Sequence, residues 1–384
     1  AIMSLRPSWR QDNIMQICQV ASQSDLNSFI AFPYQLYRND PIWVPPLKSE
    51  QKGQYYRDKN PMLDHCEYAL FLLRDSSEVI GRVAAFLDRL ALEHWKEPIG
   101  LFGSYECIQN NQASAMLLDA AQDWLRQRKM DAMRGPWSFA SQEWGLVCEG
   151  YEPSPVIMAP YNPPWYNDQL SGFGLKKVKD LLVYYADARE GYTVPERYLT
   201  LTEKVKKRYH VHTRPVDMKN LERDVVTIVQ LANQSISDNW GFYPVTDEEG
   251  RAMARDLKQI VNPKAVVIAE EDNGRPIGFA MSLPDINVLL KHMHGSLLPF
   301  GWLKLLIGLP KLTQYRMWAL GVIPEYQGRA IDTLLYRATY DALYSEKIRL
   351  EINYVLEDND RMNNALARLG VKPLRRYRVY EKTI

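Results

Sequence analysis

Several features are scarce in this sequence, and each scarcity excludes a class of protein. Cysteine is rare, and its four copies lie too far apart to form a Cys-x-x-Cys pair. We therefore expect neither a zinc site nor a disulfide framework, and a reducing cytoplasm suits the pattern. The N-terminus has no basic stretch followed by an apolar run, so no signal peptide is predicted. The net charge is only +1, which gives no bulk attraction for nucleic acid.

A long uninterrupted hydrophobic run is also missing. The most apolar segment, residues 288–309, contains lysines, histidines, glycines and a proline, whereas a membrane-spanning helix needs about 20 mostly apolar residues. No transmembrane segment is therefore predicted. Two interpretations of this segment stay open: a covering helix or flap on the substrate side, and a helix that contacts a membrane surface or a lipid.

The sequence does contain an internal repeat. With 384 residues, of which 46% are apolar and 24% charged, the chain is long enough for two domains with cores of their own. Three short matches recur in the same order at an offset of about 198 positions. Their anchor residues are the pairs Asp40 and Asp238, Gly81 and Gly278, and Gly172 and Gly370. We predict two copies of one fold, in residues 1–187 and 188–384.

The second copy has the clearer pattern of secondary structure. Apolar residues at helical spacing predict helices, and alternating or continuous apolar runs predict strands. The expected order is strand 209–214, helix 218–236, helix 248–260, strands 265–269 and 277–283, strand 316–322, helix 328–344, strand 349–354, helix 359–369 and strand 377–381. Residues 271–274 suit a hairpin turn, and residues 286–312 are an insertion. The predicted fold class is α/β with a mixed sheet.

One strand–loop–helix junction carries the strongest chemical signal. Pro324 lacks an amide proton and ends the strand before it, after which the chain turns into a helix. The first amides of that helix have no partner within it, and with the helix dipole they form a cradle for pyrophosphate. Small residues let phosphates approach the backbone, and Arg329 could add a charged contact.

This junction, residues 320–335, resembles the coenzyme-A-binding segment of the GNAT acyltransferase superfamily, where a strand ending Val-x-Pro precedes Gln/Arg-x-x-Gly-x-Gly/Ala. The element order of the second copy resembles the same fold. The resemblance implies that the strand splays from its neighbour, that its backbone pairs with the pantetheine arm, and that one acetyl-CoA or other acyl-CoA binds per chain. The cofactor-binding residues it implies are Leu320, Val322, Gln327, Gly328, Arg329, Ala330, Ile331, Asp332 and Asn359. A helix cap is the other interpretation of Asn359.

Both copies depart from the family pattern. The two small positions of the loop hold Ala330 and Asp332, and the position where family members often have a tyrosine acid holds Leu366. Residues 106–114, which correspond to the loop in the first copy, contain no glycine and no basic residue. We therefore expect the first copy to bind no cofactor and to complete the substrate cleft.

Transfer of an acyl group to an amine needs a base that takes the proton of the ammonium. Glu351, on the strand beside the expected splay, and Glu357, just after it, are the candidates. A solvated or ion-paired carboxylate is the other interpretation of each. The loop between the first two helices supplies the candidate substrate residues Asp238, Trp240 and Phe242, although a hydrophobic staple that fixes the loop would use the same aromatic residues.

The leading hypothesis is an N-acyltransferase that moves an acyl group from coenzyme A to a small-molecule amine or a peptide, by direct attack in a ternary complex. Variants would use a long acyl chain or an aminoacyl group. The alternative is a non-catalytic protein that holds a ligand or partner between its two copies, since a fold alone does not establish activity. A third hypothesis is that the protein acts at a membrane surface through residues 288–309.

Overall fold

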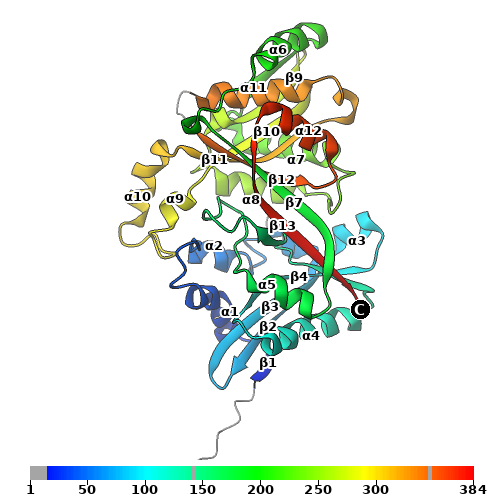
Figure 1. Cartoon of the computed structure of the whole chain (residues 1–384), viewed down its shortest axis with the longest axis vertical. Coiled ribbons are helices and arrows are strands. Elements are labelled where there is room, and N and C mark those ends of the chain that lie inside the picture. Colours follow the sequence, from blue (N-terminus) through cyan, green and yellow to red (C-terminus); the bar gives the residue numbers. More distant parts are fainter. Residues whose placement is uncertain (1–14, 140–143, 345–347) are drawn as a thin grey trace, which may run out of the picture.

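The chain folds into two halves that follow a similar element order. The computed structural model describes residues 15–139, 144–344 and 348–384 (Figure 1). The first half contains β1 (Met15–Gln19), α1 (Gln23–Leu36), α2 (Lys48–Gly53), η1 (Pro61–Asp64), β2 (Cys66–Asp75), β3 (Glu78–Asp88), α3 (Arg89–Trp95), β4 (Ile99–Cys107), α4 (Asn111–Gln127), β5 (Ala132–Gly135), β6 (Leu146–Glu149), α5 (Trp165–Gly172) and β7 (Lys176–Asp187).

The second half begins after η2 (Ala188–Glu190), a single turn that follows β7. Its elements are α6 (Glu196–Tyr209), β8 (Val211–Pro215), η3 (Met218–Asn220), α7 (Leu221–Ser235), α8 (Asp247–Leu257), η4 (Pro263–Ala265), β9 (Val266–Glu271), β10 (Pro276–Pro284), α9 (Asn287–Leu290), α10 (Gly301–Gly308), η5 (Leu309–Lys311), β11 (Gln314–Val322), η6 (Pro324–Tyr326), α11 (Ile331–Leu343), β12 (Arg349–Leu356), α12 (Asp360–Leu369) and β13 (Lys372–Thr383).

The anchor residues of the repeat occupy corresponding places in the two halves. Gly81 of β3 lies opposite Cys107, the last residue of β4, and Gly278 of β10 lies opposite Val322, the last residue of β11. In each half the next strand then pairs in parallel, β5 with β4 and β12 with β11. The sequence matches therefore mark positions that the fold uses in the same way.

The described strands form one sheet in which the two halves exchange their last strands. The order is β1-β2-β3-β4-β5-β13-β7-β12-β11-β10-β9-β8, and β6 also pairs with β13. The last strand of the second half, β13, lies between β5 and β7, while β7 pairs with β12. Figure 1 shows β7 and β13 side by side through the middle of the molecule. Each half of the sheet thus includes a strand from the other side of residue 187, where the domain boundary stays a prediction.

Helix α11 shows how packing fixes the loop that precedes it. Its apolar residues recur at helical spacing, and Ile331, Leu334 and Leu335 are almost completely buried against the sheet. Because burial of such a side chain contributes about 1.5–3 kcal/mol, this face holds the start of the helix in one place. The loop between β11 and α11 is therefore anchored at both ends.

The predicted elements of the second half are present, with some bounds changed. The turn 271–274 is confirmed, since Gly274 N–H donates to the Glu271 carbonyl. The helix expected from 328 begins at Ile331, because Gly328 and Ala330 adopt left-handed backbone angles. Strand β13 is longer than predicted, because β5, β6 and β7 pair along it. The insertion 286–312 forms two short helices, and none of the described helices is both long and apolar enough to cross a bilayer.

Candidate active site

The loop 323–330 connects the end of β11 to α11 and exposes backbone amides. Gly328 (φ +79°) and Ala330 (φ +59°) are both left-handed, which turns the chain sharply before the helix. Within the described residues, the N–H groups of these two residues donate to no acceptor. A Cβ atom at Gly328 would meet no other atom within 4 Å. Free amides and open space at the start of a helix suit an anion such as a phosphate.

The left-handed backbone at Ala330 leads to a first prediction. This conformation costs a residue with a Cβ about 1–2 kcal/mol relative to glycine. We expect Ala330→Gly to raise the free energy of unfolding by about 0.5–1 kcal/mol, since the greater freedom of glycine in the unfolded chain offsets part of the gain. Urea denaturation measures this change. Ala338→Gly, within α11, is the matched control and should lower the same free energy by about 1 kcal/mol; a loss in both variants would contradict the prediction.

Two polar side chains of the loop have different surroundings. Gln327 Nε2 donates to the Val322 carbonyl at 3.0 Å and to the Ser235 carbonyl at 3.3 Å, so this side chain ties the loop to β11 and α7. Arg329 is exposed, and its guanidinium lies 4.9 Å from the centroid of the Tyr326 ring. Arg329 is thus accessible to a ligand, whereas Gln327 mainly holds the loop in place.

The first two residues of α11 point in different directions. Ile331 is buried in the core, so only its backbone faces the loop. Asp332 is half-buried; burial raises the pKa of its carboxyl group, and the nearby charge of Arg361 opposes this shift.

Strands β11 and β12 pair briefly and then separate. Their parallel pairing runs from Gln314 and Arg349 to Met317 and Ile352. Beyond that last pair β11 continues to Val322 but pairs only with β10 on its other side. Leu320 and Val322, predicted to contact the cofactor, lie on this separated stretch. We refer to the gap between the strands as the opening and to its closed end as the apex.

Charged and polar side chains are buried together at the apex. Arg316 of β11 and Glu351 of β12 lie opposite each other and are 0% and 2% exposed. Asn353 Nδ2 donates to Glu351 Oε1 at 3.2 Å, and the buried Asp285 directly follows β10. We call these four residues the apex cluster.

The apex cluster contains carboxyl groups with raised pKa values and polar atoms without a hydrogen-bond partner among the described residues. Burial raises the pKa of Glu351, against the effect of neighbouring arginines, and raises the pKa of Asp285 to about 7. Arg316 Nη1 donates to the Ile157 carbonyl at 2.7 Å. Its Nε and Nη2, like Asn353 Oδ1, find no hydrogen-bond partner among the described residues. Since native proteins rarely leave buried polar groups unpaired, such atoms indicate a place for a polar group of a ligand.

Comparison with known proteins gives close relatives over the whole chain, although no family model matches. Protein YghO of Escherichia coli (strain K12) is 35% identical over 371 residues, which cover 94% of either protein. Bacterial ceramide synthase of Caulobacter vibrioides (strain NA1000 / CB15N) is 32% identical over 381 residues, which cover 96% of this chain and 98% of that protein. A solved tandem GNAT protein from the clavulanic acid biosynthesis pathway is 14% identical, with a TM-score of 0.57 and coverage of 96% and 98%.

The chain belongs to the family of protein YghO and bacterial ceramide synthase. Its fold is the tandem GNAT fold of the solved structures. The fold predicted from residues 320–335 is thereby confirmed.

The structure of this GNAT protein separates the two carboxylates predicted as bases. Glu357 lies past the end of β12 and accepts a hydrogen bond from Lys177 Nζ at 2.6 Å, so it is an ion-paired carboxylate away from the apex. Glu351 is buried in the apex cluster. Asn359 caps α12, because its side-chain oxygen accepts from the Met362 amide at 3.1 Å, which is the cap interpretation.

The predicted substrate loop of the GNAT fold lies where the two halves meet. Trp95 of the first half donates through Nε1 to the Phe242 carbonyl at 2.7 Å, and Phe242 is buried. The guanidinium of Arg134 lies 5.0 Å from the Trp240 ring, while Asp238 is exposed. The two aromatic residues therefore fix the loop on the first half, and Asp238 is the member of this set left open to solvent.

The corresponding opening in the first half is filled by the chain itself. Trp137 N–H donates to the Phe102 carbonyl of β4 at 2.8 Å, and its backbone leaves no room for a Cβ at Gly103. Asn110 caps α4 through the Ala113 amide at 3.0 Å. The segment after β5 thus occupies the space between β4 and β5, and a side chain takes an amide at the start of α4.

A buried ionic group that sequence patterns do not reveal joins the halves. His65 Nδ1 lies 2.9 Å from Asp88 Oδ1, and His65 Nε2 lies 3.5 Å from Glu249 Oε1 of the second half. Burial lowers the pKa of His65, but hydrogen bonds with Asp88, Cys66 and Glu249 raise it to about 12. His65 is therefore an imidazolium between one carboxylate of each half. Cys66 Sγ lies 3.7 Å from Asp88 Oδ2, beside this ion pair.

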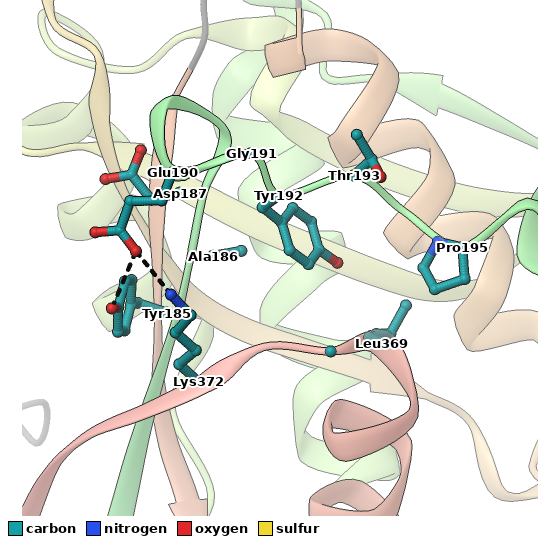
Figure 2. A pocket seen from close by; sticks show the side chains of 11 residues that line it. Tyr185, Ala186, Asp187, Glu190, Gly191, Tyr192, Thr193, Pro195, Leu369 and Lys372 are labelled. Carbon is teal, nitrogen blue, oxygen red and sulfur yellow. Dashed lines mark hydrogen bonds and ion pairs between the residues drawn. The ribbon is translucent and has the colours of Figure 1, made fainter.

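Two cavities lie behind the opening, near the link between the halves. The larger, of about 330 Å³, is shown in Figure 2, where Glu190 accepts from Lys372 Nζ at 3.0 Å on its rim. The smaller, of about 80 Å³, is lined almost entirely by apolar side chains and reaches Met317 and Ile352, the last strand pair before the opening. The apex therefore has a polar face at Glu351 and an apolar face on the opposite side of the sheet.

Proposed function

We propose that this GNAT protein transfers a long acyl chain from coenzyme A to the primary amine of a lipid-like amino alcohol and so forms an amide. The observation that carries this proposal is the 32% identity, over almost the full length of both chains, to a protein named bacterial ceramide synthase. A ceramide is an amide of a fatty acid with a long-chain amino alcohol. The opening and loop 323–330 support an acyl-CoA as the donor.

The residues of the second half would bind the donor at two places. The amides of Gly328 and Ala330 would donate to its pyrophosphate, and Arg329 would add a charge-assisted hydrogen bond. The backbone of Leu320 and Val322 would pair with the pantetheine arm along the edge of β11 that β12 leaves open. Coenzyme A supplies the acyl group as a thioester, which is reactive enough for direct attack by an amine.

Glu351 is the proposed base. It would take the proton of the acceptor ammonium, so that the neutral amine attacks and forms the C–N bond while the C–S bond breaks. The nitrogen would then lose its second proton to the leaving thiolate, which gives the neutral amide and free coenzyme A. Arg316 and Asn353 would orient the acceptor or the carbonyl oxygen through Nε, Nη2 and Oδ1, which find no partner among the residues that the structure describes. Leu366 is fully buried and offers no proton to the leaving group.

The apolar cavity beside the apex supports a long acyl chain rather than an acetyl group. Met317 and Ile352 belong to it, and they lie at the closed end of the opening, where the acyl carbon would sit. The departures at Ala330, Asp332 and Leu366 favour the non-catalytic alternative. A protein of that kind would bind acyl-CoA or lipid without forming a product.

A mass-spectrometric assay for the amide tests this proposal. The full chain is incubated with palmitoyl-CoA and sphinganine, or with acetyl-CoA and the same amine, or with palmitoyl-CoA and a short amine. We expect amide formation with the first pair and much less with the other two. Acyl-CoA binding without any amide would favour the non-catalytic alternative, and efficient acetyl transfer would exclude the long-chain specificity.

A charge reversal at Arg329 tests the donor site. A hydrogen bond to a charged group contributes about 1.5–3 kcal/mol, so Arg329→Glu should raise the Kd for palmitoyl-CoA by at least about tenfold. Isothermal titration calorimetry measures this change. Arg255→Glu, on the exposed part of α8, is the matched control and should leave the Kd unchanged. An equal effect of both variants would indicate a general influence of charge and count against loop 323–330.

A further inference from the structure

Exposed large hydrophobic side chains gather in a single segment of this protein. Among the described residues they all lie between 288 and 307, with the exception of Tyr344, and they are Val288, Leu298, Phe300, Trp302, Leu303, Leu306, Ile307. The exposed fractions of Leu298 and Leu306 are 79% and 63%. Scattered single residues of this kind are ordinary on a protein surface, but a contiguous group of them marks an interaction surface.

Helix α10 organises these side chains on one face. Trp302, Leu303, Leu306 and Ile307 recur at a spacing that puts them along one side of a helix. The remaining apolar residue, Leu305, packs on the core of the second half. The helix is therefore held to the protein by one side while its other apolar side faces solvent.

The inner part of the insertion is firmly attached, which makes the exposed face a stable surface. Leu290 and Met293 are buried in the core. Asn287 Nδ2 donates to the Pro155 carbonyl at 2.9 Å, and the Gly295 carbonyl accepts from the Lys48 amide at 3.0 Å. Both contacts join the insertion to the first half. The insertion is thus braced by both halves.

The charge of the segment has one sign. From residue 286 to residue 324 the sequence has no aspartate or glutamate, but it has lysines at 291, 304 and 311. Lys304 and Lys311 are exposed beside the apolar face, whereas Lys291 donates to Ser154. A surface with Trp and Leu flanked by lysine suits the interface of an anionic bilayer, where rings and aliphatic groups enter the acyl boundary and lysines meet phosphate headgroups.

We propose that α10 and the residues before it dock this protein on the surface of an anionic lipid bilayer. Phe300, Trp302, Leu306 and Ile307 enter the boundary between headgroups and acyl chains, and Lys304 and Lys311 contact the headgroups. A second copy of the chain suits this face less well, because it would bring the same lysines together without any acidic partner in the segment. The inference stands on these exposed side chains and does not depend on acyl transfer.

The position of the docking face relates it to the apex cluster. The insertion leaves the sheet directly after Asp285 and returns to it shortly before Arg316, so both of its ends are attached at the cluster. Figure 1 shows α9 and α10 at one side of the molecule, next to β11. A protein docked through α10 therefore holds its buried polar site close to the bilayer.

Vesicle co-sedimentation of the full chain tests the proposal. We expect the protein to pellet with phosphatidylcholine vesicles that contain about 30% phosphatidylglycerol, and much less with pure phosphatidylcholine. The double change Leu306→Glu and Ile307→Glu should lower the partition coefficient at least about tenfold, because each removes a large apolar group from the boundary and adds a charge that anionic lipids repel. Lys304→Glu should lower the partition coefficient by a smaller factor and should make binding depend less on the charge of the lipid.

Matched variants separate docking from folding. Tyr344→Ser removes the exposed large hydrophobic residue outside the segment, and Lys264→Glu reverses an exposed lysine elsewhere; both should sediment like the native protein. Unchanged thermal unfolding of the double variant would show that its fold is intact. In vesicles with brominated lipid, the tryptophan fluorescence of the native protein should be quenched. The quenching should be weaker in Trp302→Phe, which lacks the tryptophan proposed to enter the bilayer.

Two outcomes would overturn the proposal. One is equal sedimentation of the native protein and the double variant, or no sedimentation with either vesicle. The other is a dimer in light scattering that the double change converts to a monomer, without any binding to vesicles, which would assign the face to a second copy. Loss of vesicle binding with amide formation in detergent retained would leave the proposed acyl transfer standing, so the two proposals fail separately.

Discussion

Glu351→Gln should lower the rate of amide formation by about two to four orders of magnitude, the usual contribution of a positioned general base. Glutamine keeps the shape of the side chain and a hydrogen bond with Asn353, but it cannot take a proton. The Kd for palmitoyl-CoA should change little, because Glu351 lies at the apex and loop 323–330 at the far end of the opening. Single-turnover kinetics and calorimetry measure the two quantities separately.

The pH dependence of amide formation by the native protein gives a second readout of Glu351. Burial raises the pKa of this carboxyl group above its ordinary value of 4.5, and the group acts as a base only when ionised. The rate should therefore rise with pH through the raised pKa, and Glu351→Gln should remove this acidic limb. Glu357→Gln is the matched control, because the Glu357 carboxylate is paired with Lys177 outside the apex. This change should preserve both the rate and its rise with pH. A normal rate in Glu351→Gln would end its assignment as the base.

His65→Ala should lower the free energy of unfolding by about 3–5 kcal/mol, as expected when one partner of a buried ion pair is removed. The change leaves Asp88 and Glu249 buried at the contact between the halves without the positive charge between them. His210→Ala is the matched control, since the His210 side chain is 80% exposed and its loss should change the free energy by no more than about 0.5 kcal/mol. Urea denaturation of each variant measures these differences.

The sign of the pH dependence follows from the pKa of His65. The folded-state pKa of about 12 lies above the ordinary value of 6.5, so the imidazolium stabilises the folded state fully below pH 6.5. This contribution declines as the pH rises from 6.5 towards 12, because the unfolded chain no longer binds the proton. The stability difference between native protein and His65→Ala should therefore be larger at pH 6 than at pH 9. A difference that grows with pH would show that His65 is neutral in the folded state.

Local patterns predicted the strand end and the turn of loop 323–330, whereas the cofactor contacts of that loop stay a prediction. Pro324 and Gly328 each impose a backbone constraint that acts within a few residues, and the structure has the strand end and the turn where those residues stand. The apolar spacing of α11 likewise depends on neighbours within one helix. Such features can be read from a sequence because their causes are local.

The burial of the apex cluster could not be predicted, because its causes are long-range, although the sequence indicates Glu351 as a candidate base. Along β12 the alternation places Glu351 and Asn353 on one face, and two polar residues suggest a face towards solvent. That face is buried because the first half sends its segment around Ile157 across it, where the Ile157 carbonyl meets Arg316. Nothing in the local sequence of either segment specifies this contact.

The exchange of the last strands between the two halves could not be predicted from the sequence either. Both β7 and β13 are long strands at the end of a copy, and either could pair within its own half. The choice between the two arrangements depends on the whole sheet. The ionic contact between His65 and Glu249, which are far apart in the chain, could not be predicted from the sequence for the same reason.

The exchanged strands also set the order in which the protein can be completed during synthesis. The edge of β5 pairs with β13, so it has no partner until the end of the chain has been made. At about 5–20 residues per second, the roughly 240 residues between them take roughly 10 to 50 seconds to translate. During that time the nascent first half carries an open strand edge, which is a known route to aggregation. We expect such a chain to depend on ribosome-associated chaperones more than a GNAT protein whose copies each close their own sheet.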